Sequence, residues 1–359
     1  MISIKIFEDY DKNLSEVLNK IIKKNKIELF QSEEWLKTNL DIYNCNNDTK
    51  VYFVVCFKES EPCIFLPLTI KLLNGVRILT WLDSPANDYC GAIISNDIKN
   101  NGQNLYDIWY ELKHKLNFDA VVLEKIHEDI IEQIRNIIPI KPHIYQTTYI
   151  LNLKKNDFEN FYFSKNSSKS RETDRRKEKK LNSLNMNFTI KKNNIESLES
   201  HLSKKEDFYK LKKIKTFDSQ KLFRFYMNIF EKSKKDEYEF FFSKLENDKV
   251  LLSSVFGIKF DEKFYYLVPL VEKSNFLNLS PGKFNLIYII KRLSESENCN
   301  IDFGPGDESY KIDWSNKERN IYYLIKPYTF KGFLYYLYKK NYFRFRRIKF
   351  LKFLKNKFL

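Results

Sequence analysis

Residues 279–283 read Leu-Ser-Pro-Gly-Lys and have the residue types of a helix start that could hold an anion. Ser280 is a preferred N-cap residue, and Pro281 is pre-organised for the first helical position. Gly282 would allow another group to approach the backbone closely. Lys283 stands where a capping box would place Glu, so the free N–H groups of this helix start could bind a phosphate. An ordinary Ser-Pro helix start has the same residues and is the alternative.

A second group of ionisable residues lies further along the chain. Residues 302–311 read Asp-Phe-Gly-Pro-Gly-Asp-Glu-Ser-Tyr-Lys, and loops at strand ends often carry chemistry. If an amine attacks an electrophile, that amine arrives mostly protonated at neutral pH. A positioned carboxylate or tyrosine could then remove the proton. Asp, Gly and Pro are also standard turn residues, so a purely structural turn is the alternative.

Several familiar catalytic and cofactor motifs are missing from the sequence. The run Gly304-Pro305-Gly306 lacks the third glycine of a dinucleotide-binding loop, and no GxxxxGK[ST] or GxSxG pattern occurs. The four histidines have no metal-ligand spacing, and we interpret them as surface or hydrogen-bonded core residues. The five cysteines form no CxxC pair, so we expect buried reduced thiols and neither a metal site nor a disulfide framework.

The net charge of +15 comes from two segments. Segment 164–180 has eight basic and three acidic residues, the tail 327–359 has ten basic residues and no acid, and the rest of the chain is neutral. This distribution excludes a uniformly basic, histone-like protein. Segment 164–180 has no large apolar residue, which fits either a solvated linker helix or a helix that acts through charge. In the second case Arg175 and Arg176 could hold a phosphate or carboxylate of a ligand.

The tail interleaves basic residues with aromatic ones, and Phe and Leu dominate its apolar share. This composition favours an anionic membrane surface over nucleic acid. The alternative is a terminal helix that packs on the body of the protein. No stretch reaches the ~18 apolar residues of a membrane span, and the start of the sequence lacks a signal-peptide pattern. We therefore expect a cytoplasmic protein, peripheral on the inner face of the membrane if the tail docks there.

The elements that must position these residues form two similar series. The first series has a hairpin, a strand, a helix, a strand, a helix and a strand, expected at 51–57 and 62–70, 77–82, 105–116, 120–123, 129–138 and 144–153. The second has long helical stretches, a hairpin, a helix and two strands, expected at 157–184, 205–231, 250–260 and 263–271, 282–293, 300–303 and 321–325. The repeated order indicates two related α+β halves, each built on a mixed sheet.

The residues of the two motifs resemble the signature of the CelD-like, cellulose-biosynthesis-type acetyltransferases of the GNAT superfamily. The resemblance rests on Ser280-Pro281-Gly282, a following helix, and Asp302-Phe303-Gly304-x-Gly306-x-x-x-Tyr310-Lys311. The helix with Arg175 and Arg176 resembles an Arg-rich helix that precedes the family's catalytic half. Upstream matches to the family's usual N-terminal half are Phe30, Trp35, Leu66-Pro67-Leu68 and Asn87-Asp88-Tyr89. The double-domain layout is also similar to that of the Fem peptidyltransferases.

This resemblance implies two tandem GNAT-like domains with mixed β-sheets flanked by helices. They would be a degenerate domain at 1–155 and an acyltransferase domain at 156–326, followed by a basic aromatic helical tail at 327–359. The second domain would bind acetyl-CoA or another acyl-CoA as cosubstrate, without a metal. The pyrophosphate would lie near Ser280, Gly282 and Lys283, and Arg175 and Arg176 are further candidate contacts.

The acyl group would pass to an amine, such as a small-molecule, nucleotide-linked or lipid-linked amino sugar in cell-surface polysaccharide biosynthesis. Chemical reasoning on the matching positions assigns Asp302 as general base, Tyr310 as proton donor or acyl orienter, and Lys311 as charge partner. Pro305 departs from the family pattern and stiffens the loop. The first half has no comparable helix start, so we expect it to shape the acceptor cleft without catalysing.

Two alternative functions fit the same residues. A Fem-like peptidyltransferase would take an amino acid from aminoacyl-tRNA, and its RNA binding would depend steeply on salt. The sequence shows no sustained heptads for the coiled-coil arm typical of Fem proteins, which makes nucleic acid the less favoured partner. The other alternative is a non-enzymatic, membrane-associated interaction protein whose two halves are both degenerate.

Overall fold

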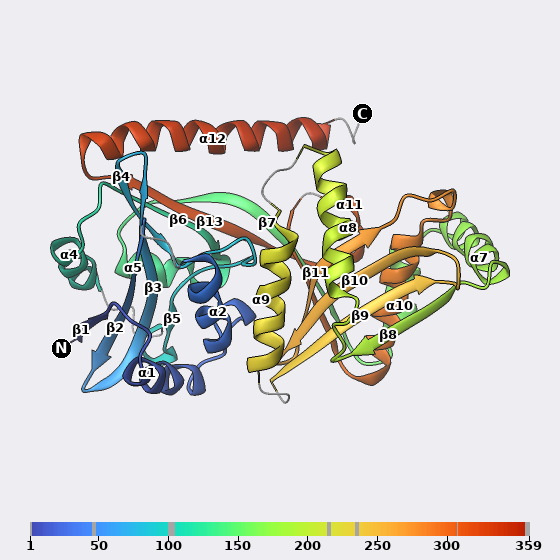
Figure 1. Cartoon of the computed structure of the whole chain (residues 1–359), viewed down its shortest axis with the longest axis horizontal. Helices are drawn as coiled ribbons and strands as arrows, with labels where there is room; N and C mark the ends of the chain where they lie inside the picture. Colours follow the sequence, from blue (N-terminus) through green and yellow to red (C-terminus); the bar gives the residue numbers. More distant parts are fainter. Residues whose placement is uncertain are drawn as a thin grey trace. The chain divides into compact units, whose positions relative to one another are not determined.

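The computed structural model describes residues 2–44, 48–99, 105–213, 217–233, 237–306 and 308–355, and in the last of these ranges it describes side chains as far as Phe343. The chain forms two compact units (Figure 1). The first unit comprises residues 1–147 and 319–359, and the second comprises residues 148–318.

In the sheet of the first unit, the first four strands are antiparallel, and the fourth pairs in parallel with the fifth. In order of pairing, its strands are β1 (Ile2–Phe7), β2 (Thr49–Lys58), β3 (Glu61–Leu73), β4 (Val76–Trp81), β6 (Ala120–His127) and β13 (Lys317–Pro327). The parallel pairing is that of β4 with β6. A short strand, β5 (Ile93–Ile94), pairs with β3. The turn between β2 and β3 consists of Glu59 and Ser60, which both have positive φ, as a tight hairpin requires.

Helices cover both faces of this sheet. They are α1 (Lys12–Lys23), α2 (Glu33–Tyr43), α3 (Asn96–Lys99), α4 (Tyr106–Lys115), α5 (Glu128–Ile137) and α12 (Phe330–Lys355). Phe53 and Phe65 pack against α1 and α2, whereas Val54 and Leu66 pack in the core that holds α4 and α5. Successive residues of a strand point to opposite faces, so this alternation places the two helix pairs on opposite sides. Helix α12 packs through Phe343 on side chains of β4, β6 and β13.

The second unit repeats the same pattern of pairing. In order, its strands are β8 (Asn187–Lys192), β9 (Tyr238–Glu246), β10 (Leu251–Phe260), β11 (Lys263–Val271), β12 (Cys299–Pro305) and the C-terminal part of β7 (Pro142–Leu153). The first four are antiparallel, β11 and β12 are parallel, and β12 and β7 are antiparallel. The order of strands is therefore the same in the two units.

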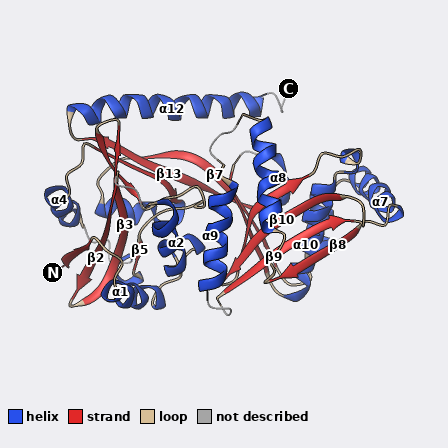
Figure 2. Ribbon diagram, in the orientation of Figure 1, coloured by secondary structure: helices blue, strands red, loops and turns tan. Residues whose placement is uncertain are grey.

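The helices of the second unit also lie on both faces of its sheet (Figure 2). They are α6 (Phe158–Lys165), α7 (Ser168–Ser183), α8 (Leu198–Leu211), α9 (Ser219–Lys232), α10 (Pro281–Ser296) and α11 (Ser309–Trp314). Helix α10 packs with Phe241 and Val255. The neighbouring strand residues Phe242 and Phe256 contact His201 of α8 and Tyr226 of α9. Helices α8 and α9 therefore lie on the face opposite α10.

Each unit takes its last strand from a distant part of the sequence. Strand β7 follows α5 of the first unit, and its residues 148–153 complete the sheet of the second unit beside β12. Strand β13 follows α11 of the second unit, and from Arg319 onward it belongs to the first unit, where it pairs with β6. The chain thus passes between the units within these two strands.

The expected fold class is confirmed: each unit has a mixed sheet flanked by helices, and a helical tail follows. Each predicted helical stretch of the second half contains two helices, because Ser167 and Asp218 act as N-caps and start new ones. Eight elements were not predicted from the sequence: β1, β5, β8, β9, α1, α2, α3 and α11.

The remaining expectations concern single residues and the membrane. Cys56, Cys63, Cys90 and Cys299 are buried, as expected, whereas Cys45 lies outside the described residues. The tail aromatics beyond Phe343 and residue 307 of the second motif also lie outside what is described. None of the described helices is long and apolar enough to cross a membrane.

Candidate functional site

The parallel strands β11 and β12 separate part-way along their length. They pair only at Phe264 with Ile301 and at Tyr265 with Asp302. Beyond these residues β11 stays paired with β10 as far as Val271, and β12 pairs with β7. The split lies at the carboxyl ends of both strands, where α/β proteins commonly bind ligands. Helix α10 follows β11 and helix α11 follows β12, so both sequence motifs border this split.

Aromatic rings fill the base of the split. The ring of Tyr266 on β11 lies 5.7 Å from that of Phe303 on β12 and 6.2 Å from that of Tyr310 on α11. The rings of Phe303 and Tyr310 are also 6.2 Å apart, in an edge-to-face arrangement. Burial raises the pKa of Tyr266, which therefore stays neutral. The predicted site residue Tyr310 thus lies at the split, with its ring against both diverging strands.

Asp302 and Lys311 hold the Gly-Pro-Gly run at the end of β12. Asp302 is 1% exposed, and its Oδ1 accepts hydrogen bonds from the backbone N–H of Gly304 at 2.8 Å and from Thr148 Oγ1 at 3.3 Å. Lys311 is also buried, and its Nζ donates to the carbonyl of Pro305 at 2.8 Å. The two predicted site residues therefore lie on either side of one tight loop and shape its backbone.

The loop requires glycine at position 306. Gly306 has a φ of +141°, which disfavours other residues. A Cβ at this position would lie 2.4 Å from Glu308 Oε2 and 2.9 Å from Lys311 Nζ. Glu308 and Lys311 form an ion pair at 3.1 Å across this space. The Gly-Pro-Gly run is therefore packed against the charged groups of α11.

The start of helix α10 differs from an ordinary serine cap. Ser280 has left-handed backbone angles (φ 56°, ψ 52°), and its side chain makes no capping hydrogen bond. Its Oγ instead accepts a hydrogen bond from Lys177 of α7 at 2.7 Å. A Cβ on Gly282 would lie 2.7 Å from Val271 Cγ2, so glycine allows α10 to pack closely on the end of β11.

Lys283 forms an ion pair with α7. Its Nζ donates to both carboxylate oxygens of Asp174, at 2.8 and 2.6 Å, and Tyr162 donates to the same carboxylate at 2.7 Å. Asp174 is buried, so this carboxylate ties α7 to the first turn of α10. Of the three residues predicted at this helix start, Ser280 and Lys283 contact α7 and Gly282 contacts β11.

Arg175 and Arg176 lie on helix α7. Both are exposed, and neither forms an ion pair within the part of the chain that the structure describes. Arg175 lines a cavity of about 170 Å³ between α6, α7 and α10, which is a different place from the split. The cation of α7 that reaches Ser280 is Lys177, which the sequence analysis did not select. Lys177 lies three residues after Asp174 and four before Leu181, on one helical face. This spacing could have identified Lys177 from the sequence.

Helix α8 contributes two further residues that the sequence analysis did not place at the site. His201 is buried, its Nδ1 lies 2.8 Å from Ser254 Oγ, and its Nε2 lies 2.9 Å from the carbonyl of Val268 on β11. One turn later, Lys205 Nζ donates to the carbonyl of Pro269 at 2.5 Å. The interpretation of His201 as a hydrogen-bonded core histidine is therefore confirmed.

Lys205 has an unusual electrostatic environment. Burial lowers its pKa to about 8; Glu308 opposes this shift, whereas the positive charges of Lys212 and Lys311 add to it. Lys205 on the β11 side and Lys311 on the β12 side are thus close enough to interact. A fraction of Lys205 is neutral near physiological pH, so this side chain can accept a proton as well as attract an anion.

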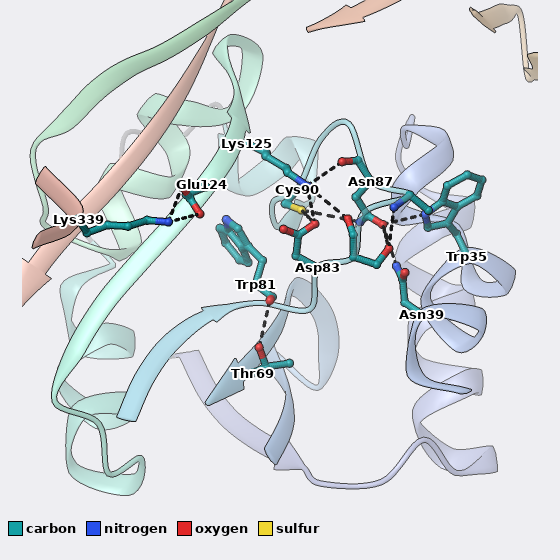
Figure 3. A network of polar contacts seen from close by, with 12 residues as sticks. Trp35, Asn39, Thr69, Trp81, Asp83, Asn87, Cys90, Glu124, Lys125 and Lys339 are labelled. Atoms are coloured by element: carbon teal, nitrogen blue, oxygen red, sulfur yellow. Dashed lines mark hydrogen bonds and ion pairs between the residues drawn. The ribbon is translucent and has the colours of Figure 1, made fainter. Parts of the chain in front are cut away.

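The N-terminal residues that carried the family resemblance lie together in the first unit. The Trp35 indole N–H donates to Asn87 Oδ1 at 3.0 Å, and the ring of Phe30 lies 5.1 Å from that of Trp35 and 5.5 Å from that of Tyr89. Figure 3 shows this network continuing from Asn87 to Lys125. The neighbouring cavity measures about 10 Å³, which is about the space of one water molecule.

Lys125 is the centre of this network. Its Nζ donates to Asp83 at 2.9 Å and to the carbonyl of Asn87 at 2.8 Å (Figure 3). Its backbone φ is +63°, at a register shift between β6 and β13. Burial would lower the pKa of Lys125, but the charge of Asp83 raises it above its usual value. The network is thus a closely packed ionic centre that fixes the loop after β4.

Comparison with known proteins supports the fold. Residues 168–312 match the model of the acetyltransferase (GNAT) domain, and this segment contains the split, the start of α10 and Lys205. Comparison with the curated proteins finds no match.

Three solved structures are similar over almost their whole lengths. FemX has 13% identity and a TM-score of 0.59 over 90% of this chain and 97% of its own. A tandem GNAT protein from the clavulanic acid biosynthesis pathway has 7% identity and a TM-score of 0.52, over 91% and 98%. A conserved protein of unknown function from Bacteroides thetaiotaomicron has 10% identity and a TM-score of 0.50, over 90% and 99%.

These likenesses show a GNAT-like fold shared with Fem and tandem GNAT structures, and the match of residues 168–312 to a GNAT domain supports an acyltransferase. The narrower resemblance to CelD-like acetyltransferases stays a prediction.

Proposed function

We propose that the protein is an acyl-CoA-dependent N-acyltransferase whose donor site is the split between β11 and β12. The observation that carries this proposal is the end of parallel pairing at Tyr265 and Asp302, within the segment that matches a GNAT domain. Two diverging strands leave room for an extended chain carrying amide groups, which could pair with backbone as an added strand does. The start of α10 beyond β11 would receive the diphosphate through the backbone N–H of Gly282, because Pro281 has none and those of Lys283 and Phe284 donate to the carbonyl of Ser280.

The reaction forms a C–N bond between the acceptor amine and the acyl carbon, and it breaks the C–S bond of the thioester. The amine gives a proton to a base, and the departing thiolate takes up a proton. Asp302 is the base assigned on the sequence motif, and Lys205 is a second candidate because its pKa is about 8. Tyr310 lies at the split and is the candidate proton donor. Lys311 holds the loop that joins Asp302 to Tyr310.

The pH dependence of kcat/KM distinguishes the two bases. If Lys205 is the base, activity rises through about pH 8, and Lys205→Met removes that rise. If Asp302 is the base, the rise through pH 8 is absent, and Asp302→Asn lowers kcat by about 10²–10⁴-fold. Lys204→Met is the matched control, since exposed Lys204 lies beside Lys205 on α8 and pairs with Glu272.

The resemblance to CelD-like acetyltransferases suggests the acceptor, which we propose is an amino sugar used in cell-surface polysaccharide biosynthesis. Calorimetry with acetyl-CoA tests the donor, and a mass-spectrometric screen of acyl-CoAs against nucleotide- and lipid-linked amino sugars tests the acceptor. We expect donor binding and a product heavier by one acyl group. If no acyl-CoA binds or reacts, the proposal is wrong.

The likeness to FemX over 97% of the FemX chain favours a second candidate, transfer of an amino acid from aminoacyl-tRNA. Binding of tRNA by this chain would weaken steeply as salt rises. Aminoacyl transfer to an amine acceptor, together with no effect of acyl-CoA, would select this function over the first.

A further inference from the structure

One face of helix α12 is fixed to the first unit. Gly332 lies directly on the backbone of Asp119, since a Cβ there would be 1.9 Å from the Asp119 carbonyl oxygen. Lys339 forms an ion pair with Glu124 (Figure 3), and the charged atoms of the two side chains lie 3.3 Å apart. The buried ring of Phe343 lies 4.0 Å from that of Tyr323. These contacts define the orientation of α12 on β6 and β13.

The opposite face of α12 is an apolar stripe exposed to solvent. Its large side chains are between 42% and 76% exposed and follow the i, i+3, i+4, i+7, i+8, i+12 pattern of one helix face: Phe330, Phe333, Leu334, Leu337, Tyr338 and Tyr342. Single exposed apolar residues are common on protein surfaces, but a contiguous row of six marks an interaction site.

The tip of the β3–β4 hairpin extends this surface. Leu72 and Leu73 are 47% and 44% exposed, and the turn continues through Asn74 and Gly75, which both have positive φ. A groove of about 690 Å³ lies between this tip and α12, and its apolar lining includes Leu73, Val76, Leu334 and Tyr338. The hairpin tip and the stripe therefore form one apolar surface with a groove between them.

The net charge of the tail favours an anionic partner. Residues 327–359 carry ten basic residues and no acidic one. Lys331 and Lys340, within the described part of α12, are exposed beside the stripe. A second copy of the same helix would be repelled by this charge, whereas an anionic lipid surface attracts it. Phe and Leu side chains insert into the region between headgroups and acyl chains.

We propose that the exposed stripe of α12 and the tip of the β3–β4 hairpin dock on the surface of an anionic bilayer. The helix lies in the plane of the interface, its apolar side chains enter the headgroup region, and the groove receives part of a lipid acyl chain. This surface is independent of the acyltransferase site in the second unit, so each proposal can fail without the other.

The test is cosedimentation of the full chain with phosphatidylcholine vesicles, with and without phosphatidylglycerol. We expect binding to the phosphatidylglycerol vesicles. The double variant Leu334→Glu and Tyr338→Glu should lower the partition coefficient about 100-fold or more, because it removes two inserting groups and adds two negative charges. Matched changes of exposed apolar residues elsewhere, Tyr110→Glu and Leu211→Glu, should leave binding unchanged.

Charge and assembly supply two further readouts. Lys331→Gln with Lys340→Gln should weaken binding about tenfold or more, and added salt should reduce this difference. Unchanged thermal unfolding of each variant shows that the fold is retained. The proposal is overturned if the wild-type chain ignores anionic vesicles or if the glutamate variant binds them equally. It is also overturned if light scattering shows that the stripe only holds two copies of the chain together.

Discussion

Protonation of His201 should make the second unit unstable in acid. Both ring nitrogens of this buried histidine are engaged, with Ser254 and with the carbonyl of Val268. The carbonyl can only accept, so Nε2 carries the proton and Nδ1 accepts the hydroxyl of Ser254. A second ring proton could donate to the Ser254 hydroxyl oxygen, but it would place a buried positive charge near Lys204, Lys205 and Lys244. Burial accordingly lowers the pKa of His201 from 6.5 to about 4, a shift that the hydrogen bond to Val268 partly opposes.

The size and the sign of the effect follow from this shift. The unfolded chain binds a proton below about pH 6.5, whereas the folded chain resists it until about pH 4. Stabilisation by neutral His201 is thus complete above the unfolded pKa and is lost as the pH falls. At about 1.4 kcal/mol for each pKa unit, the free energy of unfolding drops by about 3 kcal/mol between pH 7 and pH 4.

The assay is urea unfolding across this pH range for the wild-type chain and for His201→Gln. Glutamine can donate and accept at similar places but does not titrate, so the difference in unfolding free energy between the two proteins should shrink by about 3 kcal/mol on acidification. His114→Gln, at an exposed histidine of α4, is the control and should run parallel to wild type. Parallel curves for His201→Gln and wild type would refute the reasoning.

Three further perturbations test other contacts. Asp174→Asn should lower the free energy of unfolding by about 2 kcal/mol in chemical denaturation, because it breaks a largely buried ion pair; unchanged stability would contradict this. Gly332→Ala should loosen α12 and speed tryptic removal of the tail, whereas Asn341→Ala on the exposed face should not; equal rates would show that contact with Asp119 is unimportant. Lys125→Met leaves the Asp83 carboxylate without its cation and should lower the free energy of unfolding by about 3 kcal/mol, seen as a lower thermal midpoint. An unchanged midpoint would argue against an ionic centre.

The fold was predictable where the apolar pattern was strong. The hairpins at β2–β3 and β10–β11 have β-branched and aromatic runs separated by short polar turns, and the structure has both. Strand β9, with the sequence Tyr-Glu-Phe-Phe-Phe-Ser-Lys-Leu-Glu, does not alternate cleanly because both of its faces are covered, and it was missed. Helix α7 was predicted as a charged helix. Its contact face could not be predicted, because that face is set by the ion pair of Asp174 with Lys283, which only the tertiary structure shows.

The candidate site was only partly visible in the sequence. Asp302, Tyr310 and Lys311 follow one strand closely, so their clustering could be expected from local spacing. Lys205 could not be found in this way, because it reaches the site from α8 through the carbonyl of Pro269, far away in the sequence. Its pKa is set by that burial, which only the tertiary structure creates.

The exchange of closing strands between the units has a consequence for synthesis on the ribosome. When residues 1–147 have emerged, β6 still presents a bare edge, because β13 is made only after the whole second unit. An uncovered strand edge readily pairs with other chains. Folding of the first unit therefore finishes last, although its residues emerge first. A gene cut between the units would yield two fragments that each lack or misplace a strand, so the two parts should be obtained by co-expression rather than one at a time.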